Sequence, residues 1–118
     1  MSDDDELRGW ATQLRKGLAE LCVLACLRDG EAYGYALLQR LAGLPGLAVT
    51  ESTLYPFLNR AAEAGWVEVS HRPSTSGPPR RYYRLTPSGH GRLAVMATSW
   101  RRTTGSVEQL LPPGESDD

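Results

Sequence analysis

Apolar residues recur at intervals of three and four between residues 7 and 28, and this spacing predicts a long amphipathic helix. Residues 18–27 are apolar nearly all round, so this half of the helix should run through the centre of a core. Trp10 and Leu14 lie beyond it, and apolar side chains that project from a helix usually require a partner surface. The stripe consists of Leu7, Trp10, Leu14, Leu18, Leu21, Cys22, Ala25 and Cys26.

The pattern then predicts a second helix, a hairpin and a last helix. The second helix opens at Tyr33-Gly34-Tyr35, and residues 66–72 and 80–85 have strand character. Residues 73–79 are expected to form a flexible turn. The last helix should start with Thr86 as N-cap and Pro87 at its first position. The stripes are Ala36, Leu37, Leu38 and Leu41 on the second helix, and Leu93, Met96, Ala97, Trp100, Thr104, Val107 and Leu111 on the last.

Residues 49–60 are the most informative stretch. Leu54, Phe57, Leu58 and Ala61 follow helical spacing and should face a core, and Thr50 is a plausible N-cap. Pro56 removes one backbone hydrogen bond, so the helix either kinks there or begins near Pro56. The outward set is Ser52, Thr53, Tyr55, Pro56, Asn59 and Arg60. Such groups can contact bases and phosphates, although an ordinary surface helix would present a similar face.

The order of elements is helix, helix, helix, strand, loop, strand, helix. It predicts an α+β, mostly α fold: a winged helix-turn-helix with an N-terminal helical extension and a C-terminal helix. We expect a DNA-binding domain over residues 7–86, a dimerisation helix over residues 87–111, and disordered acidic tails over residues 1–6 and 112–118. The acidic start is unlike a secretory signal and no apolar run is long enough for a bilayer, so a cytoplasmic protein without membrane contact is expected.

The distribution of charge matters more than the net charge of −1. Seven of the 14 acidic residues lie in the two tails, which leaves residues 7–114 with 13 basic and seven acidic residues, a balance of +6. Between residues 69 and 107 there are seven arginines and no acid. A local field of one sign is typical of a protein that binds a polyanion.

The two cysteines, Cys22 and Cys26, lie one helical turn apart in the most apolar stretch. His71 and His90 are distant in sequence, so the spacing of a metal site is missing. An apolar setting also disfavours the thiolate that a nucleophilic cysteine needs. We therefore expect buried structural thiols, no enzyme activity, and neither a metal nor another cofactor.

With these residues in view, the sequence resembles the PadR family of bacterial transcriptional regulators. The resemblance covers roughly nine-tenths of the chain. Its motifs are residues 14–21 (LRKGLAEL), 33–35 (YGY), 51–56 (ESTLYP), 65–68 (GWVE) and 77–89 (GPPRRYYRLTPSG). The resemblance implies a homodimeric repressor with one winged helix per subunit, and a recognition helix that includes Pro56. The single last helix is similar to the short subfamily, in which that helix crosses to the other subunit and packs on the first helix.

The resemblance also suggests a ligand site, because Trp100 falls where a multidrug-binding member has a tryptophan that lines an interface cavity. Plain dimer packing is the alternative role for Trp100. Residues 103–106 (TTGS) depart from the family, where larger apolar residues are usual. The candidate ligand residues are Trp100, Trp10, Leu14, Met96 and Ala97. The expected dimer interface comprises Trp10, Leu14, Leu93, Met96, Trp100, Thr104, Val107 and Leu111.

The predicted function is a dimeric repressor that reads an inverted repeat in double-stranded DNA and is released by a planar aromatic effector. The expected DNA-binding residues are Thr50, Ser52, Thr53, Tyr55, Pro56, Asn59, Arg60, Arg72, Arg80, Arg81 and Tyr83. The alternative is a winged-helix module for protein–protein contact without specific DNA binding. The acid-free arginine stretch disfavours that alternative, because a protein-binding wing would not need it.

Overall fold

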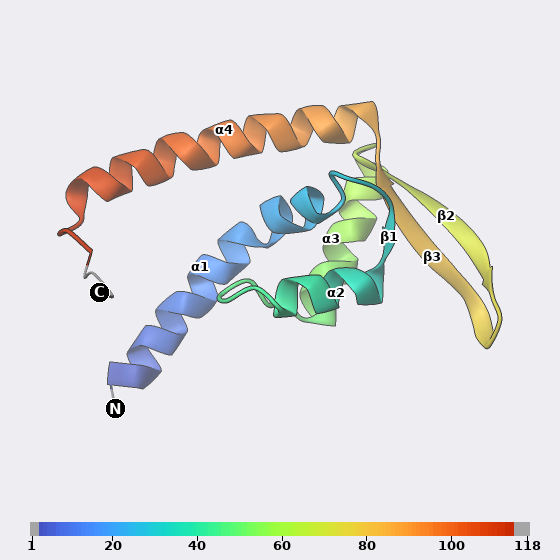
Figure 1. The fold of residues 1–118 in the computed structure, drawn as a ribbon, viewed down its shortest axis with the longest axis horizontal. Coiled ribbons are helices and arrows are strands. Elements are labelled where there is room, and N and C mark those ends of the chain that lie inside the picture. The colour runs from blue at the N-terminus through green and yellow to red at the C-terminus, as the bar shows by residue number, and fades with distance from the viewer. Residues whose placement is uncertain (1–2, 115–118) are drawn as a thin grey trace.

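The computed structural model describes the backbone of residues 3–114 and the side chains of residues 5–114. The elements are α1 (Asp3–Cys26), β1 (Ala32–Tyr33), α2 (Gly34–Ala42), α3 (Glu51–Glu63), β2 (Val67–Ser74), β3 (Gly77–Leu85) and α4 (Pro87–Leu110). Figure 1 shows the β2–β3 hairpin projecting as a wing from one end of the molecule. Helices α1 and α4 contact each other and extend from the core away from that wing.

One hydrophobic core joins the C-terminal half of α1 to α2, α3 and the base of the sheet. Val23 and Leu24 of α1 are buried, as is Leu27 directly after it, which confirms that this half of the helix is central. Helix α2 buries Leu37 and Leu41, while Ala36 and Leu38 are half-buried. Helix α3 buries the predicted set Leu54, Phe57, Leu58 and Ala61, and the sheet adds Val67, Tyr83 and Leu85.

The sheet has three antiparallel strands in the order β1-β3-β2, and two of its features differ from the predictions. The two-residue strand β1 was not predicted; it pairs Ala32 with Tyr83 and Tyr33 with Tyr82. The expected flexible turn over residues 73–79 is wrong, because β2 continues to Ser74 and β3 begins at Gly77. Pro73 lacks the backbone donor of a regular ladder, and the register shifts there, between Arg72 and Ser74, without ending the strand.

Several contacts join the start of α4 to residues 65 and 66, which are distant in sequence but close in space. The Thr86 hydroxyl accepts from the Gly89 backbone N–H at 3.0 Å, as predicted for an N-cap, and donates to the Gly65 carbonyl at 2.5 Å. The Thr86 N–H donates to the Trp66 carbonyl at 3.0 Å. The Arg92 guanidinium stacks 4.5 Å from the Trp66 ring centroid. Together these contacts fix where α4 leaves the winged domain.

The N-terminal end of the chain differs from the expected disordered tail. Residues 3–6 form the first turn of α1, where carboxylates are favoured by the positive end of the helix, and residues 1–2 lie outside the described residues. Residues 103–106 remain helical despite their poor propensity. Residues 112–114 follow α4 without regular structure, and residues 115–118 are outside the described part. Within the described part, no helix has the length and hydropathy to cross a bilayer.

Candidate nucleic-acid interface

Helix α3 begins directly after Thr50 and passes through Pro56 without interruption. Thr50 holds the N-cap position by its backbone, since its carbonyl accepts from Leu54 N–H at 2.9 Å and Thr53 N–H at 3.1 Å. Its hydroxyl does not cap the helix as predicted; it bonds instead to the hydroxyls of Ser52 at 2.9 Å and Thr53 at 3.3 Å. The structure therefore has the longer helix, with a cluster of three hydroxyls at its start.

The outward face of α3 has the predicted composition. Ser52, Pro56 and Asn59 are exposed, and Thr53 is half-buried. Arg60 is exposed and its guanidinium lies 5.7 Å from the Phe57 ring centroid, which leaves the charged end at the surface. This face therefore presents hydroxyl, amide and guanidinium groups around an exposed proline.

The arginines of the wing fall into two groups. Arg72 forms an ion pair with Glu31 and stacks 4.5 Å from the Tyr82 ring centroid. Arg84 forms an ion pair with Glu68 of the neighbouring strand. Arg80 stacks 4.7 Å from the Tyr33 ring centroid. Among the side chains of residues 5–114, no carboxylate pairs with Arg80 or Arg81, so these two carry the uncompensated charge of the wing.

Tyr83 is the one predicted DNA-binding residue that the structure contradicts. It is 1% exposed and belongs to the hydrophobic core, so its side chain cannot lie on the surface of a duplex. The alternation of the strand explains the error. Tyr83 pairs with Val69 and Ala32 on the core face, whereas the adjacent Tyr82 is on the other face.

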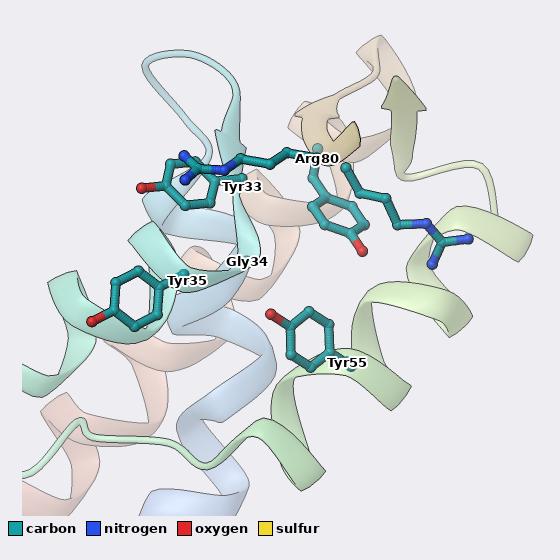
Figure 2. Close-up of a pocket in the computed structure, with 7 residues that line it drawn as sticks. Tyr33, Gly34, Tyr35, Tyr55 and Arg80 are labelled. Carbon is teal, nitrogen blue, oxygen red and sulfur yellow. The ribbon is translucent and has the colours of Figure 1, made fainter. Parts of the chain in front are cut away.

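A cavity of about 410 Å³ lies where α2, α3 and the wing meet. We call it the tyrosine notch; its lining is Tyr33, Gly34, Tyr35, Tyr55, Arg80, Arg81 and Tyr83. Figure 2 shows Tyr33, Tyr35, Tyr55 and Arg80 around the labelled Gly34. Of the lining residues, Tyr55, Tyr83, Arg80 and Arg81 were predicted to contact DNA. Sequence reasoning missed Tyr33, Gly34 and Tyr35 as site residues, although two tyrosines flanking a glycine at a helix start were a usable signal.

Tyr55 is set apart from the rest of the α3 face by its packing. A Cβ atom on Gly34 would come within 2.5 Å of Tyr55 Oη and 2.6 Å of Tyr55 Cε1, so the Tyr55 ring lies directly against the glycine. Burial, followed by the nearby Glu51 and Tyr83, raises the pKa of Tyr55 above 10.0. The Tyr55 hydroxyl therefore stays protonated and remains a hydrogen-bond donor throughout the neutral range.

A second cavity of about 310 Å³ separates α1 from the start of α3. Arg15 and Lys16 of α1 face the hydroxyl cluster of Thr50, Ser52 and Thr53 across it. Arg15 Nε is the one buried side-chain nitrogen or oxygen without a hydrogen-bond partner in the described chain. These two basic residues were not predicted as site residues, and they add positive charge beside the N-terminus of the candidate recognition helix.

The residues predicted for a dimer interface and ligand site only partly come together. Trp100 and Met96 share a groove of about 270 Å³ with Gly17, Leu18 and Leu21 of α1, together with Ser99 and Thr103. Trp10, Leu14 and Ala97 do not line it. Leu93 and Met96 are half-buried against the core of their own chain, so they offer a partner less surface than predicted. The Thr104 hydroxyl bonds within α4, to the Trp100 carbonyl at 2.8 Å.

The cysteine thiols are buried features of the core side of α1. Both are free; Cys26 is buried and Cys22 is half-buried. Burial raises the pKa of both thiols, with a smaller further rise at Cys22 from Cys26 and a smaller opposing effect of Arg40 at Cys26. In the described residues, no three histidine, cysteine or acidic side chains gather in a way that could hold a metal ion.

Three comparisons place this architecture among known proteins. The model of the "Transcriptional regulator PadR-like family" matches residues 23–95, more than half of the chain. A PadR family transcriptional regulator from Eggerthella lenta is 33% identical over 94% of this chain and 96% of its own, with a TM-score of 0.83. A PadR-like transcriptional regulator from Bacillus cereus is 32% identical over 86% of this chain and 99% of its own, with a TM-score of 0.75.

An uncharacterised protein from Lysinibacillus sphaericus is 24% identical over 98 residues, which are 81% of this chain and 90% of that protein. The family match and the two similar structures agree with the mostly helical winged fold and with a regulatory role that involves no catalysis. The chain belongs to the PadR-like family of transcriptional regulators.

Proposed function

We propose that the protein is a homodimeric, sequence-specific DNA-binding repressor. The observation that carries this proposal is the combination of the polar α3 face with Arg80 and Arg81, two wing arginines that have no carboxylate partner in the described chain. Asn59 and the hydroxyl groups of α3 can read base edges, while the arginines contact phosphates beside them. Specificity then comes from α3 and much of the affinity comes from the wing and from Arg15 and Lys16.

Dimer formation is supported by apolar side chains on the two helices that extend beyond the core. Trp10 is 60% exposed, and Leu14, Trp100 and Val107 are also exposed. An isologous interface between α1 of one subunit and α4 of its partner would bury these residues. Two recognition helices related by a two-fold axis would then read an inverted repeat with half-sites about 10 bp apart.

Release by an effector is supported by the Trp100 groove between α1 and α4. Its lining is apolar apart from two hydroxyls and contains no charged residue, which suits a planar aromatic molecule stacked on the indole. A ligand placed between the dimerisation helices changes the separation of the two recognition helices. That change couples ligand binding to DNA binding.

The test is selection of bound fragments from genomic DNA of the source with purified protein, followed by fluorescence anisotropy on the enriched duplexes. A shared inverted repeat, bound at least a hundredfold tighter than scrambled duplex, is expected. The Asn59→Ala variant should lose preference at particular base pairs and keep its affinity for scrambled duplex. A protein-interaction module would instead give no enriched sequence, and a wild-type protein without duplex binding at low salt would refute the proposal.

A further inference from the structure

The tyrosine notch has the chemistry of an anion site. Two guanidinium groups and several phenol hydroxyls line it, and none of its lining residues is acidic. Elsewhere on the wing, Arg72 and Arg84 each have a glutamate partner, whereas in the notch Arg80 stacks on the Tyr33 ring and has no carboxylate partner among residues 5–114. Two arginines gathered without a counter-charge favour an anion that comes from outside the chain.

Gly34 determines where the Tyr55 hydroxyl lies. Because the space for a Cβ at position 34 is taken by the Tyr55 ring, only glycine allows Tyr55 to turn from α3 towards the start of α2. Figure 2 shows Tyr55 reaching from α3 towards the labelled Gly34, with Tyr33 and Arg80 on the other side of the same space. The Tyr55 hydroxyl is therefore directed into the notch, away from the part of α3 that would meet base edges.

We propose that the tyrosine notch binds one phosphodiester of the DNA backbone, with Arg80 and Arg81 supplying charge and Tyr35 and Tyr55 donating hydrogen bonds. This inference rests on the proposed DNA-binding function and assigns Tyr55 to the DNA backbone, where the sequence had left both base and phosphate contact open. The location supports a DNA phosphate, because the notch is built from α3 and the wing, the two elements proposed to meet the duplex. The phosphate fixes the register of α3 in the groove.

The experiment compares tyrosine-to-phenylalanine variants by fluorescence anisotropy with one labelled duplex. Tyr55→Phe and Tyr35→Phe each remove a single hydroxyl of the notch. Tyr82→Phe is the matched control, since Tyr82 lies on the same wing but does not line the notch. Loss of a hydrogen bond to a charged phosphate should weaken binding roughly tenfold for Tyr55→Phe, with an unchanged salt slope. Tyr82→Phe should bind like wild type, and circular dichroism melts should confirm that all three fold.

The sharpest measurement replaces single phosphates of the bound duplex with neutral methylphosphonates. One position in each half-site should weaken the wild-type protein more than it weakens Tyr55→Phe, which keeps the arginine contacts to that phosphate but not the phenol contact; this non-additivity is the signature of a direct contact in a double-mutant cycle. Arg81→Ala should reduce the salt slope by about 0.9 for each phosphate that the arginine neutralises in the wild-type complex. Gly34→Ala should reproduce the weakening of Tyr55→Phe, because the added methyl group displaces the Tyr55 ring.

The outcomes separate this inference from the proposed function. If wild-type protein binds duplex tightly and both notch variants bind as well as Tyr82→Phe, the notch assignment is wrong while the DNA-binding function stands. If wild-type protein binds no duplex, both fail together. Calorimetry with inorganic phosphate tests whether the notch binds a free phosphate ion instead of a phosphate of DNA. Saturable binding that is lost in Tyr55→Phe, without any change in duplex affinity, would show that the notch takes a free phosphate and would overturn the DNA assignment.

Discussion

The carbonyl oxygen of Trp66 occupies the space that a side chain at Gly89 would need. A Cβ on Gly89 would overlap this backbone oxygen and approach Leu85 Cδ2 at 3.1 Å. The same carbonyl accepts the Thr86 N–H, so it cannot move without breaking the junction between the wing and α4. Gly89 is buried, and its lack of a side chain lets the first turn of α4 pack against the start of β2.

Gly89→Ala should therefore lower the free energy of unfolding by about 3 kcal/mol, because the clash is with backbone in a packed region. Gly91→Ala is the matched control on the same helix, where a Cβ would meet nothing within 4 Å. It should raise stability by roughly 0.5–1 kcal/mol through helix propensity. Urea unfolding followed by circular dichroism measures both, and equal stability of the two variants would contradict the packing described for α4.

The division of the wing arginines predicts unequal effects on DNA binding. Arg72 is paired with Glu31, with side chains 54% and 29% exposed respectively, so a phosphate contact by Arg72 would first have to break that pair. Arg72→Ala should therefore change the slope of log affinity against log salt less than Arg81→Ala, which should lower it by about 0.9 per phosphate contact. Glu31→Gln should steepen the slope by releasing Arg72. Equal slopes for the two arginine variants would mean that Arg72 leaves Glu31 on binding.

The helices could be predicted from the sequence because each follows one periodicity, the three- and four-residue spacing of its apolar positions. Leu54, Phe57, Leu58 and Ala61 share one face of α3 and are all buried, and the Thr86 hydroxyl caps α4 as its sequence predicts. Strand β1 was missed because two residues are too few to show alternation, and it forms only through pairing with distant β3.

The candidate site was less predictable because its geometry depends on contacts between elements far apart in sequence. The face on which Tyr82 and Tyr83 lie depends on the register with β1 and β2, and a shift of one residue exchanges them. The orientation of Tyr55 depends on Gly34, 21 positions earlier in the sequence. Likewise, the charge of Arg72 is offset by Glu31, which no local pattern links to the wing.

The raised thiol pKa values of Cys22 and Cys26 predict a dependence of stability on pH. The folded state holds these thiol protons more tightly than the unfolded state, whose thiols ionise near 9.0. Their contribution to stability is fully present below pH 9.0 and is lost as the pH rises through the folded pKa. As the pH rises above 9.0, the wild type should lose stability relative to a Cys22→Ala/Cys26→Ala variant. Urea unfolding at neutral and alkaline pH measures it, and a constant difference would count against thiol burial.

The proposed dimer predicts that two valines on α4 respond differently to a charge. Val107 is 43% exposed on the stripe that contains Trp100, whereas Val95 is 66% exposed and lies about 120° round the helix from Val107 by its spacing. Val107→Asp should give a monomer with weak operator affinity, because a carboxylate would be buried without a partner. Val95→Asp should stay dimeric in sedimentation velocity. A dimeric Val107→Asp protein would place the interface elsewhere.

The Trp100 groove predicts a fluorescence response to planar aromatic compounds. In a Trp10→Phe/Trp66→Phe background, Trp100 is the one remaining tryptophan and reports directly on the groove. A planar cationic acridine and a neutral analogue of the same size should both quench it saturably, because Leu18, Leu21 and Met96 offer apolar contact without a fixed charge. In the otherwise unchanged protein, calorimetry should show that Trp100→Ala loses the ligand while Trp10→Ala, outside the groove, retains it. Binding that survives Trp100→Ala, or the absence of any quenching, would leave Trp100 as a packing residue of the dimer.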